Sequence, residues 1–85
     1  MALYFFHFQN GPQLVRDVDG VYLASPADAL ERATRLAEGL LGEREIECDL
    51  LRSAIRVEDQ HHRRVLCLPM TCAMARENRQ RARAH

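Results

Sequence analysis

The segment that most constrains this chain is residues 3–8, Leu-Tyr-Phe-Phe-His-Phe. The run is short and aromatic and has no helical period, which is typical of a β-strand. Successive side chains of a strand point to opposite faces, so the odd-numbered residues would share one face and the even-numbered residues the other. Both faces are apolar apart from His7. We therefore expect the folded domain to cover this strand on two sides.

Turn signals follow this segment at two points. Asn10-Gly11 favours a hairpin because both residues tolerate a positive φ, whereas Pro12 disfavours the tightest turn and predicts a longer loop. We expect the return strand over residues 13–17. Asp19-Gly20 predicts a second turn before a short extended piece at residues 21–23.

The clearest local signal is a helix N-cap at Ser25. Pro26 suits the first helical position, and Asp28 stands where a capping-box acid belongs and meets the positive end of the helix dipole. Gly42 is a candidate C-cap. The predicted apolar stripe of this helix comprises Leu30, Ala33, Leu36, Ala37, Leu40 and Leu41.

Two more strands are predicted in the second half of the chain. Residues 53–58 alternate between polar and apolar, as in a half-buried strand. A polar turn at residues 59–62 leads into residues 65–68, whose continuous apolar run predicts a strand buried on both faces. Pro69 would end that strand, and Thr71 would cap a final helix over residues 72–83. Residues 43–52 fit either an extension of the first helix or a loop.

The order of these elements predicts an α+β fold of ββαββ type. We expect an antiparallel-rich, four-stranded sheet with one helix packed on one face and a C-terminal helical tail. Residues 1–70 would form a single domain and residues 71–85 an Arg-rich tail. Because one helix covers only one sheet face, a second copy of the chain or the C-terminal helix must cover the other, and we favour a homodimer. The candidate interface residues are Phe5, Phe6, His7 and Phe8.

Charge is balanced overall but uneven along the chain. The chain has twelve arginines and twelve acidic residues, and lysine is absent. The acids outnumber the arginines in residues 1–70, whereas residues 71–85 carry four arginines against Glu77. Arg76, Arg79 and Arg83 share one helix face and are candidate anion contacts, for example with phosphates of nucleic acid. They fit equally a solvated face or pairing with the acidic body of a neighbouring chain.

The cysteines and the hydropathy pattern favour a cytoplasmic protein. Three cysteines do not make a disulfide framework, and we expect reduced thiols. Cys67 is expected to be buried and inert. No stretch approaches the roughly 20 apolar residues of a membrane span, so no membrane partner is predicted.

Four groups of residues are candidate chemical sites, and each has a structural interpretation that we favour. His7 suits proton transfer or ligation, but also a packed, hydrogen-bonded histidine at the sheet face. His61 and His62 suit a metal, but adjacent histidines of a strand-like segment point apart. Cys67 and Cys72 suit a redox or metal pair, although the first is expected to be buried. The carboxylate group comprises Asp17, Asp19, Glu58 and Asp59, which are also typical turn residues. We predict no catalytic residue, metal or cofactor.

Several motifs in their order resemble a small bacterial family, common in alphaproteobacteria and known as domain of unknown function 6894. They are Tyr4-Phe5-Phe6-His7-Phe8 with Asn10-Gly11, Asp17-Val18-Asp19-Gly20-Val21, the alanine-rich helix over residues 25–36, Ile55-Arg56-Val57-Glu58-Asp59, and Val65-Leu66-Cys67-Leu68-Pro69. The resemblance covers about residues 3–70 and implies no activity, cofactor or catalytic residue. The chain departs from the family in its last hairpin, where relatives tend to have a glycine and this chain has Gln60-His61-His62, and in a longer Arg-rich tail.

Three functional hypotheses follow. The leading one is a non-catalytic, homodimeric interaction module. The alternative is a small nucleic-acid-contacting regulator that resembles HicB-type antitoxins in topology only, supported by the Arg-rich tail. The third is an enzyme or metal protein that uses His7 or the last hairpin.

Overall fold

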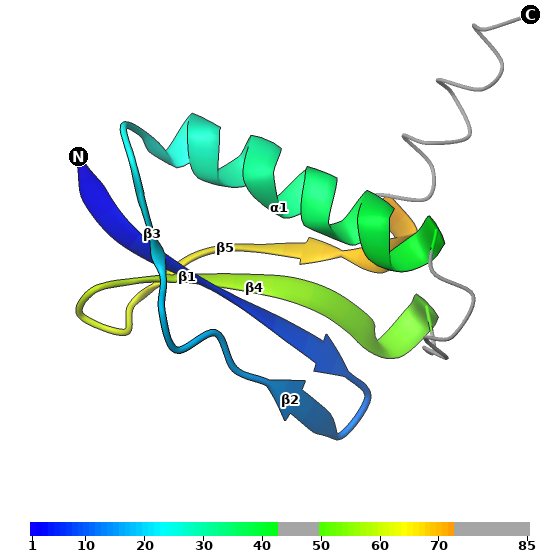
Figure 1. Cartoon of the computed structure of the whole chain (residues 1–85). Helices are drawn as coiled ribbons and strands as arrows, with labels where there is room; N and C mark the ends of the chain where they lie inside the picture. Colours follow the sequence, from blue (N-terminus) through cyan, green and yellow to red (C-terminus); the bar gives the residue numbers. More distant parts are fainter. Residues whose placement is uncertain (43–49, 73–85) are drawn as a thin grey trace, which may run out of the picture.

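A computed structural model describes residues 1–42 and 50–72 as one antiparallel sheet with a helix across one face (Figure 1). The elements are β1 (Ala2–Asn10), β2 (Gln13–Val15), β3 (Val21–Leu23), α1 (Pro26–Gly42), a 3₁₀ turn η1 (Leu50–Arg52), β4 (Ser53–Asp59) and β5 (Arg64–Pro69). The sheet order is β2-β1-β4-β5, and β3 also pairs with β1. The predicted α+β fold is thus confirmed.

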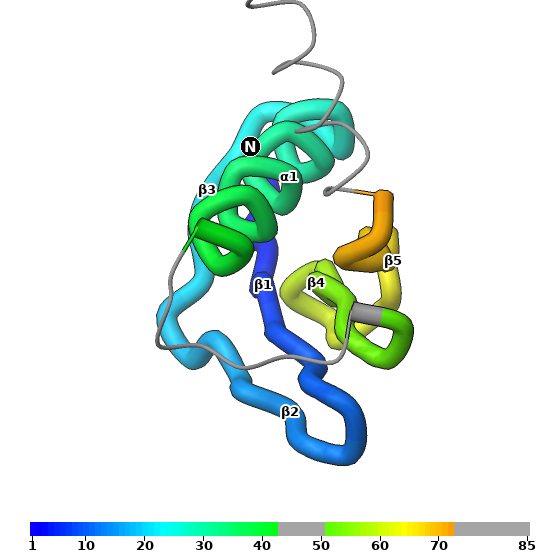
Figure 2. The backbone as a smooth tube through the Cα atoms, turned by 90° about the vertical axis from the view of Figure 1, so that its right-hand side faces the viewer, coloured from blue at the N-terminus to red at the C-terminus, as the bar shows by residue number. Residues whose placement is uncertain are grey.

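Strand β1 is the centre of the sheet. Its pairing with β4 runs from Tyr4 opposite Asp59 to Asn10 opposite Ser53. β2 pairs with one end of β1 and β3 with the other, so both lie on the side of β1 away from β4 (Figure 2). β2 and β3 therefore behave as one edge strand with an interruption.

The core lies between α1 and the even-numbered face of β1. Tyr4 and Phe6 are buried there, beside Ile55 and Val57 of β4. The helix presents alanines to this layer, and Ala29, Ala33 and Ala37 are fully buried together with Met70. Small side chains let the helix approach the sheet closely, while the aromatic rings of β1 supply the volume that a dense core needs.

The start of α1 forms as predicted. Ser25 accepts a hydrogen bond from the backbone N–H of Asp28 on its Oγ (3.2 Å), which is the N-cap arrangement, and Pro26 is the first helical residue. The helix includes Gly42, so its C-cap lies outside the described residues.

The predicted apolar stripe of α1 was partly wrong. Leu30 and Leu36 are 47% and 38% exposed, whereas Ala29 and Thr34 are buried. The aromatic side chains of β1 already fill the space, so the helix turns its alanines toward the sheet and Leu30 and Leu36 fall on its flanks, whereas Leu40 and Leu41 still pack against the core. Thr34 satisfies its buried hydroxyl by donating to the carbonyl of Leu30 (2.8 Å).

The first hairpin is tighter and shorter than predicted. Asn10 pairs directly with Gln13, which leaves only Gly11 and Pro12 in the turn. Gly11 has a φ of 58°, and proline supplies the φ near −65° that the second position of a type II′ turn requires. The return strand ends at Val15 rather than at residue 17.

The prediction that residues 65–68 are buried on both faces was wrong. β5 is the edge strand of the sheet. Leu66 and Leu68 point inward onto the core and Val65 also packs against it, but all three are only half-buried. Cys67 points the other way and is exposed, as is Cys72, and both are free thiols. The final helix begins at Met70, before the predicted cap at Thr71.

The remaining predictions for the tail and for residues 43–49 lie outside the described residues. Within the described residues, no helix is long and apolar enough to cross a membrane.

Candidate functional site

The interruption between β2 and β3 creates the most elaborate polar site of the described structure. Tyr4 pairs with Val21 and Phe8 with Val15, so a stretch of β1 that advances four residues lies opposite a stretch of the β2–β3 edge that advances six. The edge therefore has two residues too many to stay paired, and residues 16–20 bulge out as a loop. The loop leaves the backbone N–H of Phe6 without a strand partner, and the Oδ2 of Asp17 accepts it instead at 3.1 Å.

Asp17 also folds the loop itself. Its Oδ1 accepts the backbone N–H groups of Asp19 (3.1 Å) and Gly20 (3.2 Å), which is an Asx turn. Burial alone raises the pKa of Asp17, but the three N–H donors and the nearby His7 outweigh it, so the pKa lies below its ordinary value. The side chain is therefore held as a carboxylate by the backbone.

Gly20 closes the loop against β1. Its φ is 72°, and a Cβ there would lie 2.9 Å from Leu3 Cδ1, 3.0 Å from Phe5 Cε1 and 3.1 Å from the carbonyl oxygen of Tyr4. Only glycine fits this conformation and this contact.

His7 links the loop to β4. The backbone N–H of Asp17 donates to Nδ1 (3.0 Å), so that nitrogen carries a lone pair. The other nitrogen, Nε2, then bears the proton and donates to Glu58 Oε1 at 2.9 Å. With both nitrogens engaged and 7% of the residue exposed, His7 has the arrangement of a packed, hydrogen-bonded histidine.

The His7 ring belongs to a row of three rings with Phe5 and His62. The Phe5 ring is parallel to the His7 ring within 4°, with centroids 6.4 Å apart, and the centroid of the His62 ring lies 6.3 Å from that of Phe5. Together with Glu58 and the loop, these rings line a cavity of about 290 Å³. The full lining comprises Phe5, His7, Arg16, Asp17, Val18, Glu58 and His62.

The turn between β4 and β5 places His62 in this row. Asp59 Oδ1 accepts the N–H groups of His61 (2.8 Å) and Arg63 (3.0 Å), and the Arg63 bond is the main reason that the pKa of Asp59 is lowered. His62 has a φ of 61°, in the left-handed region. That conformation costs a non-glycine residue on the order of 1–2 kcal/mol.

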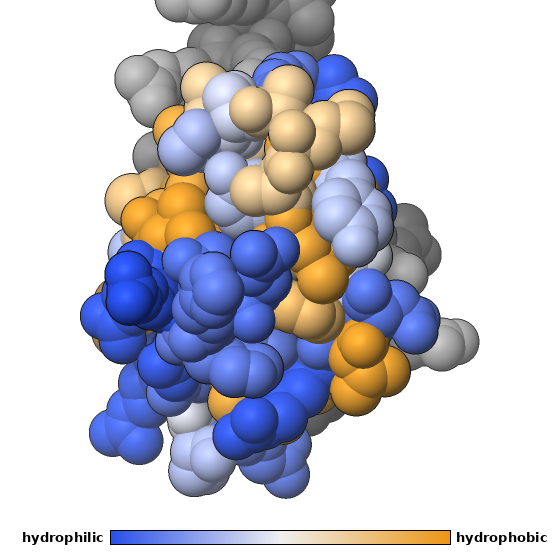
Figure 3. Space-filling model, turned by 90° about the vertical axis from the view of Figure 1, so that its left-hand side faces the viewer, coloured by the Kyte–Doolittle hydropathy of each residue, from blue (hydrophilic) through white to orange (hydrophobic). Residues whose placement is uncertain are grey.

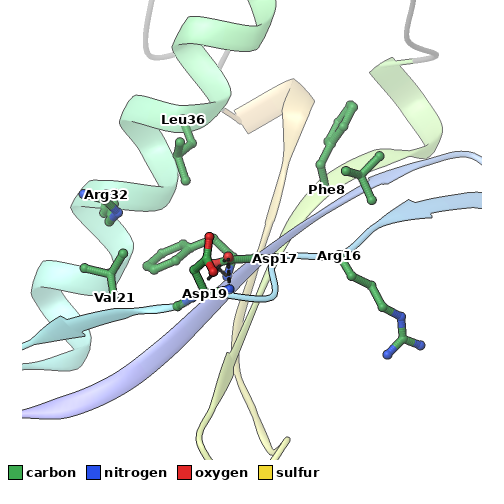
Figure 4. Close-up of a pocket in the computed structure, with 10 residues that line it drawn as sticks. Phe8, Arg16, Asp17, Asp19, Val21, Arg32 and Leu36 are labelled. Atoms are coloured by element: carbon green, nitrogen blue, oxygen red, sulfur yellow. Dashed lines mark hydrogen bonds between the residues drawn. The ribbon is translucent and has the colours of Figure 1, made fainter.

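A second, larger cleft of about 420 Å³ lies on the helix side of the loop (Figure 4). Phe6 and Phe8 line it from β1, and Leu36 and Arg32 point toward it from α1. The Arg32 guanidinium lies 5.8 Å from the centroid of the Phe6 ring. Arg16 belongs to the lining, but its guanidinium points away from the cleft.

The structure separates the residues that the sequence grouped together. Phe5 and His7 lie on the face opposite α1, but Phe6 is in the core and Phe8 packs against it. Of the four carboxylates, Asp17 and Glu58 meet at the cavity, while Asp59 holds the last turn. In residues 1–42 and 50–72, no group of three or more His, Cys, Asp or Glu side chains is placed to hold a metal ion.

Sequence reasoning missed Val18 and Tyr22, which are 81% and 65% exposed. Tyr22 pairs with Leu3 and so shares the face opposite α1, and Val18 borders the cavity. The signal for Val18 was available, because Asp17-Val18-Asp19-Gly20 places an apolar residue at the tip of a turn. Arg76, Arg79 and Arg83 lie outside the described residues.

Fold and site together define a small α+β domain with a helix on one sheet face and a ring-lined cavity on the other. The family model of a domain of unknown function, DUF6894, matches residues 3–71, and the chain belongs to this family. Neither the curated proteins nor the solved structures contain a match.

Proposed function

We propose that this chain is a non-catalytic interaction module of the cytoplasm that forms a homodimer through the sheet face opposite α1. We call that surface the open face. It comprises Leu3, Phe5, His7, Gln9, Leu14, Tyr22, Ala54, Arg56, Glu58, Arg64, Cys67 and Pro69, with Val18 at its border.

The observation that carries this proposal is the apolar exposure of the open face. Tyr22 is 65% and Leu14 36% exposed, Phe5 is only half-buried, and Val18 projects beside them. Figure 3 views the molecule from one end rather than onto the open face, and shows hydrophobic areas beside a large hydrophilic one. Apolar surface rimmed by polar groups is typical of protein interfaces.

The open face carries charges of both signs, which suits contact with a second copy of the chain. On β4, Arg56 and Glu58 are two residues apart and point away from the core, so both lie on this face. A two-fold axis that lies in the interface plane and crosses β4 between them would bring each Arg56 opposite Glu58 of the partner subunit. Such self-complementarity is what a symmetric dimer needs.

The hydrogen bonds of His7 and Asp17 support a structural role for both residues. A general base needs a free lone pair within reach of a substrate, yet Nδ1 of His7 is occupied by a backbone N–H. Both oxygens of Asp17 are likewise engaged by backbone donors. The free thiols of Cys67 and Cys72 fit the reducing cytoplasm that we propose.

Light scattering of the full chain from low to high micromolar concentration tests the proposal. We expect a dimer mass at high concentration, and we expect Tyr22→Arg to weaken the dimer at least about tenfold, because exposed tyrosines are frequent anchors of interfaces. Leu30→Arg on α1 is the control, because this residue is also exposed but lies on the other layer.

A clean monomer at every concentration would sink the proposal. Salt-dependent binding of generic DNA or RNA that disappears when residues 76–85 are deleted would instead support the nucleic-acid-contacting alternative.

A further inference from the structure

We infer that Val18 of each copy inserts into the cavity beside Phe5 of the other copy, so that the open face carries both the projection and the recess that specify the dimer. This inference rests on the proposed homodimer and names the contact that would set its geometry.

The projection is a valine that is both exposed and firmly positioned. Val18 is 81% exposed, although its loop is tied to β1 on both sides of it. On one side, Asp17 binds the N–H of Phe6 and donates its own N–H to His7. On the other, Gly20 packs against Leu3 and Phe5. An apolar side chain presented by a loop that is already ordered loses little entropy on binding, as an interface anchor requires.

The recess lies directly beside the projection. Phe5 forms its apolar wall, flanked by the rings of His7 and His62, and its volume is about 290 Å³. An apolar cavity of about 150 Å³ is enough to hold a benzene molecule, so a valine side chain has ample room.

Projection and recess adjoin, which is the arrangement that two-fold symmetry requires. Val18 itself borders the cavity. A two-fold axis next to the shared border places each Val18 over the recess of the partner subunit, and the two contacts form together. The interface is then isologous and closed, which leaves no free projection to recruit a third copy.

The strained conformation of His62 supports the same site. A glycine would satisfy the backbone of this turn without strain, yet the chain holds a histidine at a φ of 61°. The imidazole lies beside the Phe5 ring and extends the wall of the recess. Strain of this kind persists where a side chain has a use, and a wall for the incoming Val18 is the use that the geometry offers.

Val18→Arg tests the projection, and Val15→Arg is its matched control. Val15 is the same residue type and is 62% exposed, but it pairs with Phe8 and therefore lies on the helix side of the sheet. Sedimentation equilibrium should show that Val18→Arg raises the dimer dissociation constant at least about tenfold, while Val15→Arg changes it by less than about threefold. Circular dichroism should show both variants folded, because neither side chain is buried.

His62→Gly tests the recess through two effects of opposite sign. Removal of strain should raise the urea midpoint of the monomer, measured at concentrations well below the dissociation constant. Loss of the ring should at the same time weaken dimerisation. A variant that is less stable as a monomer, or one that dimerises as well as the wild type, would contradict the role given to His62.

The outcomes separate this inference from the proposed function. If the wild type dimerises and Tyr22→Arg disrupts the dimer while Val18→Arg does not, the inserted valine is wrong and the open-face dimer stands. If the wild type is monomeric throughout, both are overturned.

Discussion

The two faces of β1 are built on different physical principles. On the face toward α1, the even-numbered residues Tyr4 and Phe6 are 6% and 9% exposed and pack on alanines of the helix. On the opposite face, Phe5 remains half-buried. His7 is buried there without a second layer above it, and both of its ring nitrogens are hydrogen-bonded, one to the loop and one to Glu58. The same six-residue segment therefore supports a hydrophobic core on one side and a polar network on the other.

The comparison shows how a single helix suffices for a strand that is apolar on both sides. Burial of a large apolar side chain contributes about 1.5–3 kcal/mol, whereas a net hydrogen bond contributes about 0.5–1.5 kcal/mol. The helix side should thus dominate the stability of the monomer. The open face is held in shape by the loop over residues 16–20, and its remaining apolar surface is available for association.

The largest expected difference is between Phe6→Ala and Phe5→Ala. Phe6 is in the core, and its truncation should lower the free energy of unfolding by about 3–5 kcal/mol. Phe5 is half-buried, and its truncation should lower that free energy by about 1–2 kcal/mol. Urea denaturation at concentrations that keep the chain monomeric measures both. Equal losses would show that the open face is as closely packed as the core.

The next effect concerns the contact between the loop and β1. Gly20→Ala must adopt a φ of 72° and place its Cβ 2.9 Å from Leu3 Cδ1, so we expect a loss of about 2 kcal/mol or more. Gly39→Ala is the control, since nothing lies within 4 Å of its Cβ and alanine favours the helix by about 1 kcal/mol. Destabilisation by Gly39→Ala, or none by Gly20→Ala, would refute the steric argument.

The helix face of the fold was largely predictable from the sequence. Alternation placed Tyr4 and Phe6 on one face, the Ser25 cap defined the start of α1, and the alternation of residues 53–58 predicted a half-buried strand, whose Ile55 and Val57 are buried. These signals are local, and local backbone preferences and periodicity determine them.

What the sequence did not reveal depends on contacts between distant segments. The helix α1 buries its alanines rather than Leu30 and Leu36 because the rings on β1 are large. The helical period of the sequence carries no information about the size of those rings. β5 has the composition of a buried strand but lies at the sheet edge, because its position is set by pairing with β4. Asp17 looked like an ordinary turn residue, and its bond to Phe6, eleven residues earlier, exists only because β2 and β3 share one edge of β1.

A smaller effect should appear in the acid dependence of stability. Because the folded state lowers the pKa of Asp17 below its ordinary value of 3.8, its contribution is fully present above that pH and is lost as the pH falls through the folded-state pKa. Asp17→Asn replaces one accepting oxygen by an NH₂ group that faces a backbone N–H. We expect a loss of about 1–2 kcal/mol at pH 7 that shrinks below pH 4. Urea midpoints from pH 7 to pH 3 check this, and a difference that grows on acidification would contradict it.

The smallest effect tests which nitrogen of His7 carries the proton. If Nε2–H donates to Glu58 Oε1, as the Asp17 N–H on Nδ1 requires, then the amide oxygen of Glu58→Gln can accept the same bond. We expect a change in unfolding free energy below about 1 kcal/mol, whereas Glu58→Leu leaves the buried N–H without an acceptor and should lose about 1–3 kcal/mol. Nitrogen-15 NMR of the imidazole should show the Nε2–H tautomer in both the wild type and Glu58→Gln. An Nδ1–H tautomer would mean that the loop is held by another contact and that the polar face of β1 is less tightly specified than its hydrogen bonds indicate.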